Sequence, residues 1–213
     1  MSAAIVRAPI AIAALLCAFA PSIAHAKDAG AVTVDFLGGG FIRSDKGFYE
    51  HARAFGYPIS GGGGGSLEVG VELLPRLSIY GSWSGYSNTA ERRLASITLT
   101  TQAFLLHARF AFARHEWKHR WGDVLLQGEA SIGGGAYAIK STFEDPSLYS
   151  ASFDHVRRTA GARFGVDASV YWRSLGFLVG YAFHFAPAAI EDNLGGKVYA
   201  GGHEIRAGLS LRF

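Results

Sequence analysis

The chain has 213 residues, enough for one domain with a sizeable core, and it is rich in glycine and aromatic residues. A formal net charge of only +3 argues against a dedicated nucleic-acid binder, which needs a concentrated basic face. The one cysteine, Cys17, lies in an N-terminal apolar run behind Leu16, where a lipoprotein signal needs a small residue. Disulfide-stapled folds and thiolate chemistry are therefore excluded for the rest of the chain.

Residues 1–26 have the pattern of a secretory signal peptide. Arg7 is the only charged side chain, the apolar run Pro9–Ala20 follows, and Ala24–Ala26 supplies the small-x-small cleavage pattern. The apolar run is too short to span a bilayer as a helix. We therefore expect an exported protein whose mature chain is residues 27–213.

Beyond the signal, apolar and polar residues alternate with a period of two, which predicts strands with two unlike faces. The last segment is the clearest, since Ile205 and Leu209 share one face while Glu204 and Arg206 share the other. No later stretch is long and apolar enough for a transmembrane helix. The eight expected strands are Ala31–Phe41, Ser66–Leu74, Arg76–Gly85, Thr98–Ala113, Asp123–Ile139, Val156–Trp172, Ser174–Ala186 and Gly202–Phe213.

The expected connections alternate between short and long. Short turns fall at Pro75, in Arg114–Gly122 and at Arg173. The long, polar connections are Ile42–Gly65, Tyr86–Ile97, Lys140–His155 and Pro187–Gly201. Short turns at one end and long loops at the other are typical of outer-membrane barrels. The glycine run Gly61–Gly65 is interpreted as a flexible loop, because a phosphate-binding glycine loop would need a following helix.

Charged residues of both signs fall on the minority face of these strands. Inside a narrow barrel opposite charges can neutralise one another, whereas the Phe, Leu, Val and Ala face suits hydrocarbon. We predict an interior ion-pair network in which each arginine has a carboxylate partner. Its members are Asp35, Glu68, Glu72, Arg109, Glu129, Arg163, Asp167, Glu204 and Arg206.

Aromatic residues gather at the short-turn end. Trp117, Trp121 and Trp172 lie in or beside those turns, and Phe213 ends the chain on the same side. This arrangement predicts an aromatic girdle at one membrane interface, and Trp83 could serve the other.

The signal peptide, the eight alternating segments and the ending Leu209–Phe213 resemble small outer-membrane β-barrel proteins of the OmpA/OmpX type. The resemblance covers the whole mature chain. It implies an all-β, eight-stranded, antiparallel up-and-down transmembrane barrel in the outer membrane. It also implies that Phe213 is an assembly signal for the barrel-assembly machinery.

We interpret the chain as a non-enzymatic barrel that contributes to envelope integrity or to surface interaction through its long loops. The alternatives are a narrow channel or carrier for small hydrophobic molecules and, more remotely, a lipid-modifying enzyme. We expect a monomer with no cofactor, in contact with the lipid bilayer and lipopolysaccharide. The cations that could contact lipopolysaccharide phosphates are Arg43, Lys46, Arg53, Arg92 and Arg93.

Three histidine patterns bear on chemistry. His115–His119 would set two zinc ligands on one face of a helix, but it lies in a basic turn between strands. His107 is expected inside the barrel beside Arg109, as a hydrogen-bonding group or a proton-sensitive switch. His184 and His203 lack the nearby serine that a lipid hydrolase of this fold would carry.

Overall fold

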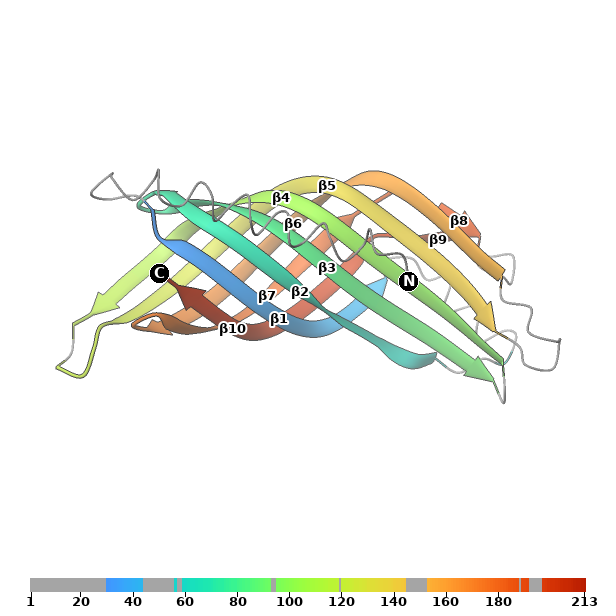
Figure 1. Ribbon diagram of the computed structural model, residues 1–213, viewed down its shortest axis with the longest axis horizontal. Coiled ribbons are helices and arrows are strands. Elements are labelled where there is room, and N and C mark those ends of the chain that lie inside the picture. The colour runs from blue at the N-terminus through green and yellow to red at the C-terminus, as the bar shows by residue number, and fades with distance from the viewer. Residues whose placement is uncertain are drawn as a thin grey trace.

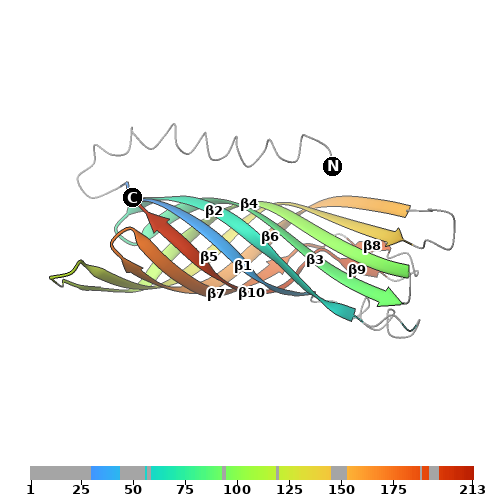
Figure 2. The ribbon, with the colours of Figure 1, turned by 60° about the horizontal axis from the view of Figure 1, so that its bottom comes forward.

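The computed structural model describes residues 30–43, 56, 59–92, 95–118, 120–144, 153–187, 189–191 and 197–213. Eight antiparallel strands form a closed barrel in the order β1-β10-β7-β6-β5-β4-β3-β2, which confirms the predicted fold (Figures 1 and 2). The strands are β1 (Val32–Arg43), β2 (Ile59–Leu74), β3 (Leu77–Arg92), β4 (Ala95–Trp117), β5 (Val124–Glu144), β6 (Phe153–Trp172), β7 (Leu175–Phe185) and β10 (Gly202–Arg212). The predicted signal peptide lies outside the described residues.

The short β8 (Ala189–Glu191) and β9 (Lys197–Tyr199) pair with each other in a separate hairpin. This hairpin contacts β5 and β6 at the end of the barrel away from the short turns (Figure 1). The described residues include no helix long and apolar enough to cross a bilayer.

In the half of the barrel nearer the short turns, the charged face is inside and the apolar face is outside. On β4, Arg109 is fully buried, whereas its neighbour Phe110 is 51% exposed and Leu106 is 65% exposed. The same alternation holds on β6, where Arg163 and Asp167 are buried and Phe164 is exposed. An apolar outer surface over a charged interior is the arrangement of a barrel bathed in lipid.

The strands run farther than the sequence predicted at the other end. Antiparallel pairing continues through most of the expected loop Tyr86–Ile97, because β3 ends at Arg92 and β4 begins at Ala95. Gly61–Gly65 is part of β2 and not a flexible loop, since its backbone pairs with Gly85–Thr89 of β3. The loop predictions were wrong because the polar residues of these segments face outward, which is the reverse of the lower half of the barrel.

In this upper extension the interior is largely apolar, although it also buries Arg43, Asn88 and Ser141, and the outer face is polar. Ile97, Leu99 and Ile139 are fully buried, while Thr98 and Thr100 on the outer face of β4 are partly exposed. The buried cluster at this level comprises Ala90, Ile97, Leu99, Ala103, Leu105, Tyr137, Ile139, Ala186 and Ala200, with Phe143 packed against it. The upper part of the wall therefore has the polarity of a water-soluble barrel.

At the short-turn end, the hairpin between β4 and β5 reaches beyond the other turns (Figure 1). β4 continues to Trp117 and β5 begins at Val124, so the connection is shorter than the predicted Arg114–Gly122. A bulge between Ala111 and Ala113 adds one residue to β4, which locally increases its twist. Trp117, Trp121, Trp172 and Phe213 are all exposed at this end, as the girdle requires.

Candidate functional site

The centre of the barrel contains an ion-pair network built from five strands. Arg109 of β4 contacts Glu68 of β2 and lies 2.9 Å from Asp35 of β1. Arg206 of β10 lies 2.5 Å from Glu68 and makes a bidentate pair with Asp167 of β6, its Nη2 lying 2.8 and 2.7 Å from the two carboxylate oxygens. All five side chains are nearly or fully buried. Glu68 therefore bridges two arginines, and the chain of contacts crosses the whole lumen.

Two predicted members lie at the edge of this network. The Arg163 guanidinium is 3.7 Å from Glu68, and its two terminal nitrogens have no hydrogen-bond partner among the described residues. Glu129 is likewise 3.7 Å from Arg109. These two groups contribute charge to the network without the close hydrogen bonds of its centre.

The sequence pattern gave no reason to include Tyr80, yet this residue completes the centre. The Arg109 guanidinium lies over the Tyr80 ring, 3.9 Å from its centroid, and the His107 ring stacks on the same ring at 5.4 Å. His107 Nε2 is 3.7 Å from Glu68. Tyr80 fills the space opposite Gly70, where any Cβ would lie about 2.5 Å from the ring. Gly70 pairs with Tyr80 across the β2–β3 ladder, and this pairing of the smallest residue with a large ring could have indicated that Tyr80 fills the lumen.

Glu204 belongs to a second layer above this centre. Its carboxylate is 2.9 Å from His184 Nε2, and the Tyr137 hydroxyl lies 3.0 Å from His184 Nδ1. Phe41 and Tyr86 stack at 4.6 Å and meet the His184 ring edge-on. Glu204 is thus on the interior face, as predicted, but its close partner is a histidine instead of an arginine.

Glu72 lies apart from the centre, at the short-turn end. It is 3.0 Å from Arg114 and 2.5 Å from Arg212, and Arg114 also contacts Glu116 at 2.8 Å. These side chains are partly exposed. The nine predicted members therefore form a central network, an upper histidine–glutamate layer and a separate cluster at the lower rim.

The sequence suggested that Arg43 lies in a solvent-exposed loop, but in the structure its side chain is buried. Its guanidinium is buried inside the barrel, where it donates to Thr101 Oγ1 at 3.0 Å and to the Leu99 carbonyl at 3.1 Å. It also donates to the Tyr199 carbonyl at 3.2 Å and so ties β9 to the wall. β1 extends through Arg43, and the strand parity turns this side chain inward. The side chains of Lys46, Arg53, Arg92 and Arg93 lie outside the described part of the chain.

The histidine motifs provide no arrangement for metal or serine chemistry. His115 and Glu116 lie on a strand and point to opposite faces, with Glu116 held by Arg114, and His119 is outside the described residues. The described residues contain no group of three His, Cys, Asp or Glu side chains placed to hold a metal ion. On the outer face, His203 Nδ1 lies 2.6 Å from the Tyr181 hydroxyl.

No protein-family model and no curated protein matches the chain. Among solved structures, it is similar to the N-terminal β-barrel domain of OprF from Pseudomonas aeruginosa, at 12% identity and a TM-score of 0.44, over 86% of this chain and 97% of that one. Ail, the attachment invasion locus protein of Yersinia pestis, matches at 14% identity and 0.43, over 85% and 97%. Neisserial surface protein A matches at 13% identity and 0.43, over 86% and 96%. The likeness to these eight-stranded outer-membrane barrels concerns the fold, which the strand pairing establishes independently.

Proposed function

We propose that this chain is a non-enzymatic outer-membrane barrel that is closed to ions and contributes to envelope integrity or to surface interaction. The exposed Phe, Leu, Val and Ile side chains and the aromatic girdle support residence in a bilayer. The polar outer face of the upper extension supports its exposure to water beyond that bilayer. This rim is the part of the molecule available for surface contacts.

The observation that carries the proposal is the buried network around Glu68. An eight-stranded barrel is only wide enough for side chains to fill it. Here Arg109 and Arg206 reach carboxylates on β1, β2 and β6, so paired side chains occupy the lumen. An ion crossing the barrel would have to separate these buried pairs, and leaving one charge of such a pair uncompensated costs about 3–5 kcal/mol.

Targeting and partners complete the proposal. Residues 1–26 direct export, and Phe213 is read by the barrel-assembly machinery. Phe213 is 71% exposed, and its backbone pairs with Val32, so the last residue helps to close the barrel between β10 and β1. The barrel works as a monomer in lipid. Lys46, Arg53, Arg92 and Arg93 remain the candidates for contact with lipopolysaccharide phosphates.

The test is planar-bilayer conductance of the purified protein, with a wide porin in the same chamber as a positive control. We expect no steady single-channel openings. Fractionation of the producing cells should recover the protein in the outer membrane, in a heat-modifiable folded form. Steady openings of the wild type would contradict the closed barrel, and recovery as a soluble periplasmic protein would contradict its membrane location.

A further inference from the structure

A row of small side chains crosses five neighbouring strands on the outer face of the barrel. Pairing of β5 with β6, β6 with β7, β7 with β10 and β10 with β1 aligns one residue from each strand. The aligned residues are Gly128, Ala168, Val179, Ala207 and Gly38. All five line one hollow of about 900 Å³ on this face.

Larger side chains flank this row on both sides. Val166, Tyr181 and Ile205 form one wall and are 41–63% exposed. Leu126, Val170, Phe177, Leu209 and Phe36 form the other wall and are 43–55% exposed. Bulky walls beside a floor of mostly glycine and alanine make a groove that runs obliquely over the apolar surface.

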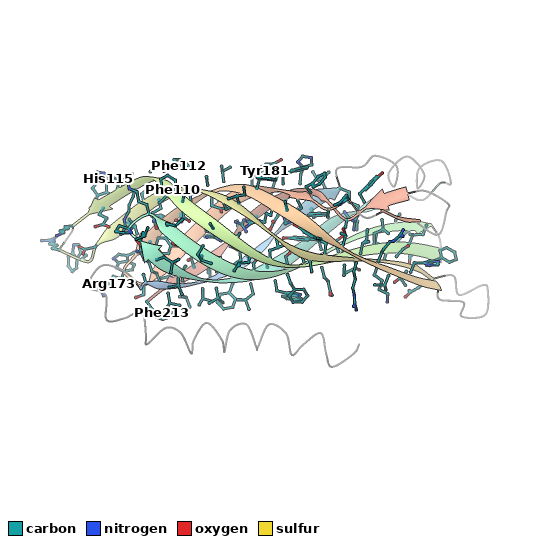
Figure 3. The ribbon with its side chains drawn as sticks, turned by 90° about the horizontal axis from the view of Figure 1, so that it is seen from above. Phe110, Phe112, His115, Arg173, Tyr181 and Phe213 are labelled. Atoms are coloured by element: carbon teal, nitrogen blue, oxygen red, sulfur yellow. The ribbon has the colours of Figure 1, made fainter. Side chains whose placement is uncertain are left out.

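The groove ends at a cationic hollow near the short turns. The bulge in β4 places the Phe112 ring over Gly128, and Phe112, Gly128 and Ala168 also line a second hollow of about 500 Å³. Arg76 and His115 belong to this second hollow. In Figure 3, Phe112 and His115 lie near the short-turn end, and Tyr181 lies farther along the same side of the barrel.

Two side chains of this hollow are available to an anionic ligand, Arg76 as a cation and His115 as an N–H donor. His115 is exposed on the outer face of β4, and Arg76 is exposed in the β2–β3 turn and forms no ion pair with a described residue. Arg114 is already engaged by Glu72 and Glu116, whose carboxylates lie toward the interior side of the strand. The end of the groove thus combines an apolar channel with positive charge at the level of the aromatic girdle.

We propose that this groove binds one glycerophospholipid of the leaflet on the short-turn side. The phosphate lies against Arg76 and His115, and one acyl chain runs along the row to Gly38, starting beside the Phe112 ring that covers Gly128. Four strand spacings make that row about 19 Å long. Half of the hydrocarbon core is about 15 Å thick, so the row accommodates one tilted chain of a single leaflet. This inference rests on the proposed membrane location of the barrel.

The test is native mass spectrometry of the folded wild type, titrated in detergent with dioleoylphosphatidylglycerol. We expect one lipid to bind more tightly than all others. Ala168→Leu or Gly38→Leu should weaken this first binding by about fivefold or more, because the added side chain fills the floor. Gly38 has room for the change, since an added Cβ meets no atom closer than 3.9 Å. Ala160→Leu, on the outer face of the same β6 but outside the groove, should leave binding unchanged.

The headgroup contact is tested separately. Arg76→Gln with His115→Gln should weaken phosphatidylglycerol binding by about fivefold and leave dioleoylglycerol binding unchanged, because only the former has a phosphate. Lys118→Gln, in the same hairpin but outside both hollows, is the control. Equal weakening by Ala168→Leu and Ala160→Leu would overturn the groove, and equal affinity for the two lipids would overturn the phosphate site. If the protein folds into vesicles and either of these results is found, the lipid site is wrong but the proposed function stands. Failure of the protein to insert into vesicles would overturn both the lipid site and the proposed function.

Discussion

The lower wall of the barrel and its upper extension have the same backbone but opposite polarity. On β4, the lower wall buries Arg109 and exposes Phe110, whereas the extension buries Leu99 and leaves Thr98 on the outside. The β3–β4 ladder has no register shift anywhere along its length. The change of polarity along the strand is therefore caused by the order of polar and apolar residues and not by a bulge.

Given the proposed membrane location, we interpret the inversion as the level at which the strand leaves the bilayer. On β4 the outward apolar stretch from Phe104 to Phe112 covers nine positions, close to the roughly 9–11 residues that a tilted strand needs to cross a membrane. Farther up, water replaces lipid outside, so the hydrophobic effect favours apolar side chains inside. Charged pairs fill the lumen at the level where the outer face is apolar. A mainly apolar core packs inside the barrel at the level where the outer face is polar.

The largest expected effect comes from breaking the lower interior. Arg206→Met leaves Asp167 buried without its close cation and removes one of the two arginines that contact Glu68, so it should lower the free energy of unfolding by about 3–5 kcal/mol. Urea unfolding in vesicles, followed by Trp fluorescence, measures the loss. Arg163→Met is the matched control, because its nearest carboxylate is 3.7 Å away, and it should cost clearly less. Equal losses would mean that the close contacts of Arg206 contribute nothing special.

The next effect tests the lipid face. Phe164→Arg should destabilise the barrel by about 2–4 kcal/mol if the residue lies near the bilayer midplane, and Phe183→Arg is the second position of the same kind. Thr98→Arg, on the outward face of the upper extension, should cost almost nothing, since water already bathes that position. A negligible cost at both phenylalanines in the same folding assay would mean that the inner and outer faces are reversed.

A third pair of variants tests the apolar core of the extension. Leu99→Ala removes a fully buried side chain and should cost about 2–3 kcal/mol. Leu106→Ala makes the same change on the same strand, where the side chain is 65% exposed to lipid, and should cost much less. The comparison uses the unfolding assay described for Arg206. A larger loss at Leu106 than at Leu99 would contradict a packed core in the extension.

The smallest effect on stability is expected at the chain terminus. Phe213→Ala keeps the backbone pairing with Val32 and removes an exposed ring, so unfolding in vitro should change little. The yield of folded, heat-modifiable protein in cells should nevertheless fall, because the assembly signal is weakened. Phe177→Ala, which removes an exposed ring from the neighbouring β7 outside the terminal segment, is the control. Unchanged cellular yield of the Phe213 variant would remove the proposed role of the terminal residue.

The sequence allowed the lower wall to be predicted well, because one face of each strand is charged and the other is apolar. The position of Arg109, Arg163 and Arg206 on one face followed directly from a period of two. Individual partners did not follow, since alternation gives the face of Glu204 but not its neighbour His184 across the β7–β10 ladder. The centre of the network depends on strand order and stagger, which no local pattern encodes.

The upper extension was missed for a different physical reason. The stretch from Tyr86 to Ile97 has the composition of a loop, although Ser87 and Thr89 alternate with the buried Asn88 and Ala90. Arg43 was placed in solvent for the same reason, because its strand was expected to end at Phe41. If the inside and outside faces are allowed to exchange polarity above the lipid, the sequence pattern predicts longer β3, β4 and β5 strands.

The boundary itself is the most direct test of this two-region account. Apart from Cys17 in the predicted signal peptide, the chain has no cysteine, so single cysteines can be placed along the outward face of β4. In intact vesicles, a water-soluble maleimide should label cysteines at Thr98 and Thr100 rapidly and those at Leu106, Ala108 and Phe110 only after detergent is added. Labelling of the Leu106 and Phe110 positions as rapid as that at Thr98, without detergent, would contradict the account.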